Sequence, residues 1–326
     1  MLKEYIKRDK YYLIFLVVVI VICNIKLPYY VSAPGGTIDI GDRIEYDEGV
    51  DYKGSLNMLY VRQYVANVPI YLMSYVLPDW DLEDISRNQI SSDESAKEID
   101  LRNKIMLDNS INNAIYVAYT ASDKKVEVEE MEFMVVGTTI SNGLEIGDEL
   151  LEINGKDITD FNMIKDMINS HNIGDKLKVK IEREDREQEV SVEIKEMDGA
   201  KGLGVVIVTD YDLEFSPDIE LKFKKSESGP SGGLMMALSI YSAISGEDIL
   251  KGRDIAGTGT INMDGEVGEI DGIKYKIIGA VRDKMDVILV PSGNYEEALK
   301  VVKEKEFDIE LVKVDTFEDA IEYLIK

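Results

Sequence analysis

The sequence predicts a mixed α/β, or α+β, protein whose folded part follows an N-terminal membrane helix. Three observations predict this class. A basic N-terminus leads into an apolar run, the middle of the chain has short β-type segments between glycine turns, and strands alternate with helices from residue 200 onward. With 326 residues, the chain is long enough for two or three domains.

The first segment, residues 1–28, is predicted to be a signal anchor. Its uninterrupted apolar part, 11–23, has 13 residues, and counting through to Leu27 gives 17, the lower limit for a spanning helix. A signal peptide cut after Ala33 is the alternative, and a buried core helix is a third reading. Pro28 and the two tyrosines after it resemble an interfacial boundary and favour a retained anchor. The positive-inside rule then places the N-terminus in the cytoplasm and the rest outside it, as a single-pass protein of the cell membrane.

Composition excludes several functional classes. The chain has 37 Lys and Arg against 63 Asp and Glu, a net charge of −26, which argues against nucleic acid as a partner. Its single cysteine, Cys23, lies in the apolar run, and its single histidine, His171, precedes Ser231 by 60 positions. The sequence therefore predicts no disulfide within the chain, no zinc site of the Cys/His type and no other metal or cofactor, and it argues against a Ser-His-Asp triad.

Residues 29–125 are expected to be an N-terminal strand and helical segment associated with the last domain. The stretch "SAPGGTIDIGDRI" suggests short strands and turns, and "LNMLYVRQYV", residues 56–65, suggests a longer strand. Residues 67–123 look mainly helical, with isoleucines at helical spacing. Trp80 fits a core or interface position. No chemistry is expected in this segment.

Residues 126–198 carry the signature of a second domain. Strands are expected at 133–140 and 149–153, a helix at 160–169, and a hairpin at 175–183 and 188–195. The pattern "NGLEIGDELLEING" with the closing "GDKLKVKIERE" resembles a PDZ domain. The resemblance implies a strand edge to which an extended peptide adds. No clear carboxylate-binding loop is visible in the sequence, and a PDZ domain that serves only as a spacer stays an alternative.

Residues 199–326 alternate strands and helices and hold the candidate nucleophile. In "GPSGGLMMAL" Ser231 precedes two glycines at the start of an apolar helix, where each glycine costs about 0.5–1 kcal/mol against alanine. That cost suggests a close approach of the backbone. Ser231 could instead be only a helix N-cap, and Gly232 and Gly233 could serve only helix packing. "NMDG" predicts a hairpin between two strands.

A serine without histidine needs another base, and the helix in "EIDGIKYKIIGAV" offers two lysines. On a helical wheel Lys274 falls in the middle of the apolar arc and Lys276 at its edge. Periodicity alone does not choose between them, although an edge position suits a desolvated lysine that reaches a cleft.

The ordered motifs "GPSGGLMMAL", "IAGTGTINMDGEVGEIDGIKYKIIGA" and "VILVP" resemble the proteolytic domain of Lon proteases, and most closely the membrane-anchored proteins that join a PDZ domain to a Lon domain. The resemblance implies Ser231 as nucleophile, Lys276 as base and Thr258 beside the lysine amine. It also implies a ring-forming homo-oligomer. Gly232 stands where the family usually has alanine, and Ser228 where cytosolic Lon enzymes carry an acid.

The sequence thus predicts an ATP-independent, anchored serine endopeptidase with a Ser-Lys dyad, since no Gly-x-x-x-x-Gly-Lys-[Ser/Thr] motif occurs in these residues. Its expected partners are polypeptide substrates and the membrane. Burial would have to lower the pKa of Lys276 toward 7, and backbone amides at Gly232 would stabilise the oxyanion. The alternatives are an inactive Lon-like and PDZ membrane scaffold that binds protein partners, and a different acyl hydrolase with the same dyad.

Overall fold

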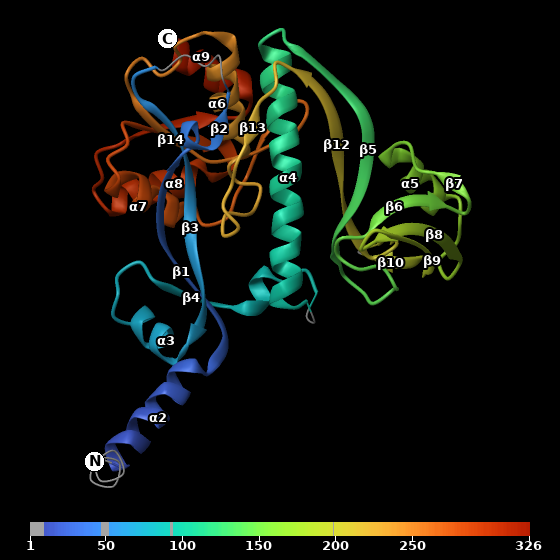
Figure 1. Cartoon of the computed structure of the whole chain (residues 1–326), viewed down its shortest axis with the longest axis horizontal. Coiled ribbons are helices and arrows are strands. Elements are labelled where there is room, and N and C mark those ends of the chain that lie inside the picture. The colour runs from blue at the N-terminus through green and yellow to red at the C-terminus, as the bar shows by residue number, and fades with distance from the viewer. Residues whose placement is uncertain (1–9, 47–51, 92–93, 198) are drawn as a thin grey trace, which may run out of the picture.

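The computed structural model describes residues 10–46, 52–91, 94–197 and 199–326. These residues form an α/β body, a smaller β-rich domain held beside it by two long strands, and a helix that projects from the foot of the body, below β1 (Figure 1). The long helix α4 (Ala96–Ala121) stands between the body and the two long strands.

One six-stranded sheet organises the body, and it joins strands from both ends of the chain. Its order is β18-β17-β14-β3-β1-β4. Strands β3, β14, β17 and β18 run parallel, while β1 is antiparallel to both β3 and β4. The bounds are β1 (Lys26–Asp39), β3 (Ser55–Asn67), β4 (Asp81–Asp84), β14 (Asp254–Gly257), β17 (Val287–Pro291) and β18 (Glu310–Val314).

Helices cover both faces of this sheet because successive side chains of a strand point to opposite faces. Along β17, Val287 and Leu289 pack with α6 (Gly233–Ser245), α4 and α9 (Phe317–Ile325), whereas Ile288 and Val290 pack with α7 (Ile273–Arg282) and α8 (Ser292–Glu304). The parallel strands require such crossover helices. The helix and strand pattern predicted after residue 200 is present, including the antiparallel β15 (Thr260–Ile261) and β16 (Val267–Gly268) around "NMDG".

One prediction for the N-terminal segment is wrong. "SAPGGTIDIGDRI" does not break into short strands, because most of it continues β1 with a register shift between Pro34 and Gly36. The glycines of this segment allow the backbones of β1 and β3 to approach closely. A Cβ on Gly35 would lie 1.7 Å from the carbonyl oxygen of Tyr60. The prediction that residues 67–123 are mainly helical is confirmed by α3 (Val68–Ser74) and α4. Within this segment "DLED" forms β4; its polar sequence gives no strand signal, and the pairing is provided by β1.

The β-rich domain is an antiparallel sheet of order β12-β5-β6-β8-β9 packed with one helix, α5 (Phe161–Asn169). Its strands are β5 (Lys125–Thr138), β6 (Glu149–Ile153), β8 (Lys176–Arg183), β9 (Arg186–Glu193) and β12 (Val205–Ser216), with β7 (Lys156–Asp157) beside β6 and a small hairpin of β10 (Lys195–Met197) and β11 (Ala200–Gly202). β5 and β12 pair along their whole length and form the two-stranded arm that reaches the body (Figure 1).

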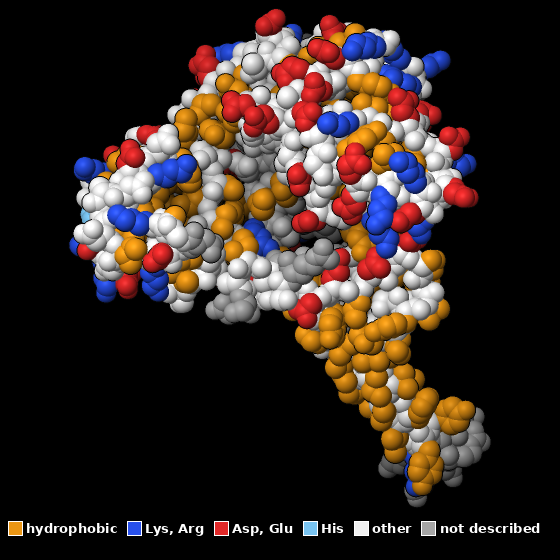
Figure 2. Space-filling model, turned by 180° about the vertical axis from the view of Figure 1, so that it is seen from behind, with side chains coloured by type: hydrophobic (Ala, Val, Ile, Leu, Met, Phe, Trp, Pro, Cys, Tyr) orange, Lys and Arg blue, Asp and Glu red, His pale blue; other side chains and the backbone are white. Residues whose placement is uncertain are grey.

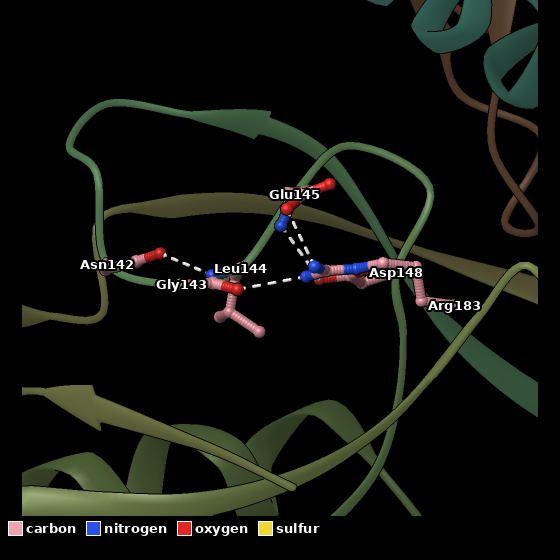
Figure 3. A network of polar contacts seen from close by, with 6 residues as sticks. All are labelled: Asn142, Gly143, Leu144, Glu145, Asp148 and Arg183. Atoms are coloured by element: carbon pink, nitrogen blue, oxygen red, sulfur yellow. Dashed lines mark hydrogen bonds and ion pairs between the residues drawn. The ribbon is translucent and has the colours of Figure 1, made fainter. Parts of the chain in front are cut away.

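The turn before β6 is organised around one buried carboxylate. Asp148 is fully buried and accepts two hydrogen bonds from the guanidinium of Arg183, at 2.6 and 2.7 Å (Figure 3). Arg183 also donates to Glu145 and to the carbonyl oxygen of Gly143. A bidentate pair of this kind fixes geometry as well as charge, which accounts for the aspartate in the Gly-Asp signature of the turn. Gly147 adopts a positive φ of 95°, which accounts for the glycine.

The projecting helix α2 (Lys10–Asn24) has no buried residue, and its apolar side chains are exposed, for example Tyr12 at 81% and Phe15 at 65%. Within the described parts of the chain, no helix is long and apolar enough to cross a membrane. Figure 2 shows the apolar surface of this helix continuing into the foot of the body.

Candidate active site

Lys276 lies on α7 and is buried, with only 2% of its surface exposed. Ile273, Ile277 and Ala280 of the same helix are also buried and belong to the apolar core beneath the sheet. The amine Nζ lies 2.8 Å from the hydroxyl Oγ1 of Thr258, which is itself fully buried. An amine in this position is removed from bulk water and held by one polar neighbour.

Burial lowers the pKa of Lys276 to about 7, and the carboxylate of Asp271 opposes this shift. Burial acts in this direction because the ammonium form loses its hydration, whereas the neutral amine loses much less. At neutral pH a large fraction of the side chain is therefore an unprotonated amine, able to accept a proton.

Thr258 joins this amine to the backbone of Ser231. Its hydroxyl donates a hydrogen bond to the carbonyl oxygen of Ser231 at 2.9 Å, and it accepts one from Lys276. The amide of Gly259 donates to the same carbonyl oxygen at 2.9 Å. The amide of Thr258 in turn donates to Leu289 of β17. The structure thus brings together three of the predicted residues around one hydroxyl group, on a strand end fixed by the sheet.

The two glycines after Ser231 stand at close approaches. A Cβ on Gly233 would lie 2.7 Å from Ser110 Oγ and 2.9 Å from the backbone nitrogen of Ile261, and one on Gly232 would lie 2.9 Å from the sulfur of Met58. The helix begins at Gly233 with Gly232 as its N-cap residue, and no side chain caps it, so Ser231 is not the N-cap.

Two backbone amides at the start of α6 are free to donate hydrogen bonds. Among the described residues, no backbone hydrogen bond is donated by the amide of Ser231 or of Gly232. The first N–H groups of a helix lack intrahelical acceptors and carry the positive end of the helix dipole. They are suited to stabilise a negative charge that develops beside Ser231.

The other lysine of α7 has a different environment. Lys274 is one-third exposed and pairs with Asp81 at 2.5 Å, and the same carboxylate accepts a hydrogen bond from Tyr275. The helical wheel was therefore misleading in placing Lys274 at the centre of the apolar arc. Helix α7 packs against β1 and β3 and also against α8, so its buried surface does not form a single stripe.

The remaining predicted features lie away from this arrangement. His171 follows α5 in the β-rich domain, where its Nδ1 lies 2.8 Å from the carbonyl oxygen of Met167. No group of three or more His, Cys, Asp or Glu side chains is placed to hold a metal ion in the ranges that the structure describes. Sequence reasoning assigned no chemistry to residues 67–123, yet α4 contacts the loop before α6 that contains Ser231 (the Ser231 loop). The backbone carbonyl oxygen of Asn103 accepts a hydrogen bond from the amide of Gly229, and Ser110 Oγ donates one to the carbonyl oxygen of Pro230. Isolated polar residues within a helical pattern gave no signal for this.

We predict that Lys276→Met stabilises the folded chain at pH 6.5. The folded-state pKa of about 7 lies below the usual 10.5, so the unfolded chain binds more protons between these values and wild-type stability rises with pH across this window. The increase in the free energy of unfolding caused by Lys276→Met is therefore largest below pH 7. At pH 9.5 this increase should be about 3 kcal/mol smaller than at pH 6.5. Urea unfolding at both pH values measures it.

Lys274→Met is the matched control, because it removes an ion pair rather than a buried amine. It should show no gain at pH 6.5. An equal effect of Lys276→Met at both pH values would contradict the lowered pKa.

Comparison with known families assigns two segments of the chain. Residues 224–326 match the Lon protease (S16) C-terminal proteolytic domain, and residues 135–194 match a PDZ domain. Solved PDZ domains of SdrC-like proteins resemble the second segment: the one from Listeria monocytogenes is 22% identical and covers 26% of this chain and 93% of its own, and the one from Listeria innocua is 24% identical and covers 23% and 92%. Both have a TM-score of 0.22.

Curated relatives match the first segment. Lon protease of Campylobacter jejuni is 36% identical over 100 residues, which are 30% of this chain and 12% of the relative. Lon protease 2 of Borreliella burgdorferi is 30% identical over 118 residues, 35% of this chain and 15% of the relative. The chain therefore spans less than a sixth of the length of these relatives. Two segments of the chain thus match a Lon-type proteolytic domain and a PDZ domain.

Proposed function

We propose that the chain is an ATP-independent serine endopeptidase in which Ser231 is the nucleophile and Lys276 the general base. The observation that carries this proposal is the buried amine with a pKa near 7, hydrogen-bonded to Thr258, whose hydroxyl holds the carbonyl of Ser231. A lysine acts as a base at neutral pH only when its surroundings lower its pKa, and here burial lowers it.

Acylation begins with the neutral amine of Lys276. It takes the proton of the Ser231 hydroxyl while the Ser231 oxygen attacks a peptide carbonyl, and the free amides at Ser231 and Gly232 donate to the oxyanion. The resulting ammonium then gives its proton to the leaving amine as the C–N bond breaks. The acyl group remains on Ser231, and Lys276 is neutral again.

Deacylation reverses these roles with water in place of the serine. Lys276 takes a proton from the attacking water, and the tetrahedral intermediate is held by the same two amides. Collapse releases the new carboxyl group, and the ammonium returns its proton to the Ser231 oxygen. Thr258 keeps the Lys276 amine oriented during both acylation and deacylation, because its hydroxyl accepts a hydrogen bond from Lys276 and donates one to the Ser231 carbonyl.

The PDZ domain would supply substrate binding. Within the described residues, β12 pairs only with β5 and is an edge strand of the PDZ sheet. An extended peptide can add to such an edge through backbone hydrogen bonds, which do not depend on sequence. Because these 326 residues contain no ATP-binding phosphate loop, the expected substrates are unfolded or otherwise accessible polypeptides.

We also propose that α2 anchors the chain in a membrane, with the body on the extracytoplasmic side. Exposed apolar side chains of α2 continue into α3 (Val68–Ser74) and the residues after it, where Leu72 is 59% and Val76 79% exposed (Figure 2). Tyr29, Tyr71 and Tyr75 form a chain of ring contacts at this junction. Aromatic side chains of this kind are enriched at the boundary between lipid and water.

Cleavage of casein without ATP tests the catalytic proposal. Wild-type chain should cut it, Ser231→Ala and Lys276→Ala should each lose at least a thousandfold in kcat, and Lys274→Ala should retain activity because its amine pairs with Asp81. Activity should rise with pH through about 7, where Lys276 loses its proton.

Loss of activity in Lys274→Ala but not in Lys276→Ala would move the base to the other lysine. Full activity of Ser231→Ala would remove the proposed nucleophile. A wild-type chain that binds casein without cutting it would favour the scaffold alternative.

Vesicle flotation tests the membrane proposal. The chain should float with vesicles of phosphatidylcholine and phosphatidylglycerol, and Leu16→Asp combined with Ile20→Asp should stay in the dense fraction, because an aspartate within a membrane helix costs about 2.5–3.5 kcal/mol. Ile173→Asp, at an exposed apolar residue of the PDZ domain, is the matched control and should float like wild type. Flotation of the double variant would contradict an anchor at α2.

A further inference from the structure

The middle of helix α4 carries a row of polar side chains. It lies between the two-stranded arm of β5 and β12 and the loop that contains Ser231. Asn109, Ser110, Asn112 and Asn113 occupy adjacent turns, and Ser110 and Asn113 are buried. Asparagine and serine are poor residues for a helix interior, and their burial costs free energy unless hydrogen bonds compensate it. We therefore expect these side chains to form hydrogen bonds with the elements on either side of α4.

On the side of the body, Ser110 and Asn113 bind two segments of the proposed site, one directly before Ser231 and one shortly after Thr258. Ser110 Oγ donates to the carbonyl oxygen of Pro230, the residue before Ser231, at 3.1 Å. Asn113 Nδ2 donates to the carbonyl oxygen of Ile261 at 3.2 Å, on the strand that follows Thr258. The proposed nucleophile and the residue that orients its base are thus attached to the same stretch of α4.

On the side of the PDZ domain, Asn109 and Asn112 bind β12. Asn109 Nδ2 donates to the carbonyl oxygen of Thr209 at 2.7 Å and to Asp210 Oδ1 at 3.3 Å, and Asn112 Nδ2 donates to the same Oδ1 at 3.0 Å. The amide of Tyr211 also donates to this oxygen at 3.0 Å. One carboxylate oxygen on the edge strand therefore gathers three donors.

A direct bond connects the two sides. Asn113 Nδ2 donates to Asn109 Oδ1 at 3.2 Å, one helical turn away. Asn109 reaches β12 and Asn113 reaches the body, so a short series of hydrogen bonds runs from Asp210 to Ile261. Ser110, next to Asn109 on the helix, adds a separate bond to Pro230. We name the four side chains of Asp210, Asn109, Asn113 and Ser110 the α4 polar ladder.

We propose that the α4 polar ladder positions the Ser231 loop for catalysis and connects it to the strand that receives peptide. This inference rests on the proposed function above. Ser110 and Asn113 act as positioning residues, because they bind the backbone on either side of the reacting groups and not the substrate. Asn109 and Asp210 extend the support to β12, so that the geometry at Ser231 depends on how β12 sits against α4.

Hydrogen exchange tests the ladder without relying on catalysis. In the full chain, Asn109→Leu and Asp210→Ala should each speed amide exchange in residues 229–236 at least tenfold, because the loop loses its support. Asp210→Asn keeps an acceptor oxygen at the same place and should restore slow exchange. Lys104→Ala, which removes an exposed ion pair with Asp100 on the same helix, is the matched control and should exchange like wild type.

Casein cleavage gives the second readout on the same four variants. Displacement of a reacting group by about 1 Å can cost a hundredfold in rate. Asn109→Leu and Asp210→Ala should therefore lower kcat by roughly 10- to 100-fold with KM changed less than threefold. The midpoint of the acid limb should stay near pH 7, because Lys276 and Thr258 are unchanged.

The two readouts separate the two claims. Unchanged exchange at 229–236 in Asn109→Leu would overturn the ladder whatever the activity. Slow cleavage by Asp210→Asn that equals that of Asp210→Ala would also overturn it. Faster exchange in a chain whose wild type does not cleave casein would support the ladder and remove the proposed function.

Discussion

The burial of one amine is the constraint on which the candidate site depends. A lysine side chain that titrates near 7 needs a nearly dry position, one hydrogen-bond acceptor and no close carboxylate strong enough to restore its charge. Helix α7 provides the dry position, Thr258 provides the acceptor, and Asp271 opposes the shift without reversing it. The dry position also depends on β1 and β3, which pack against α7 and lie far from Lys276 in the sequence.

The sheet explains how the dry position is made. Strands β1 and β3 come from the first seventy residues, yet they pair into the sheet of the C-terminal half and lie under α7. The backbones of α7 and β1 approach each other closely, since a Cβ on Gly279 of α7 would lie 3.0 Å from the backbone nitrogen of Gly36 in β1. The Lon-type domain is thus completed by strands from the N-terminal half, and the PDZ domain is an insertion between α4 and α6.

The strands and helices after residue 200 could be predicted from the sequence, because alternating apolar residues and glycine turns are local signals. Sequence reasoning also singled out Ser231, whereas the choice of Lys276 over Lys274 and the role of Thr258 came from a family resemblance. The helical wheel failed there because α7 is packed on two sides. The ladder on α4 was out of reach, because Asn109 and Asn113 gain their meaning only from partners about 100 and 148 positions away.

The most direct test is the pKa of the Lys276 amine, measured by NMR titration of lysine side chains in the Ser231→Ala chain, with the signal assigned by its loss in Lys276→Met. We expect the Lys276 amine to titrate with a midpoint at about 7, well below the usual value for a lysine. A midpoint for Lys276 near 10.5 would contradict the account, because the amine would then be protonated and unable to serve as a base.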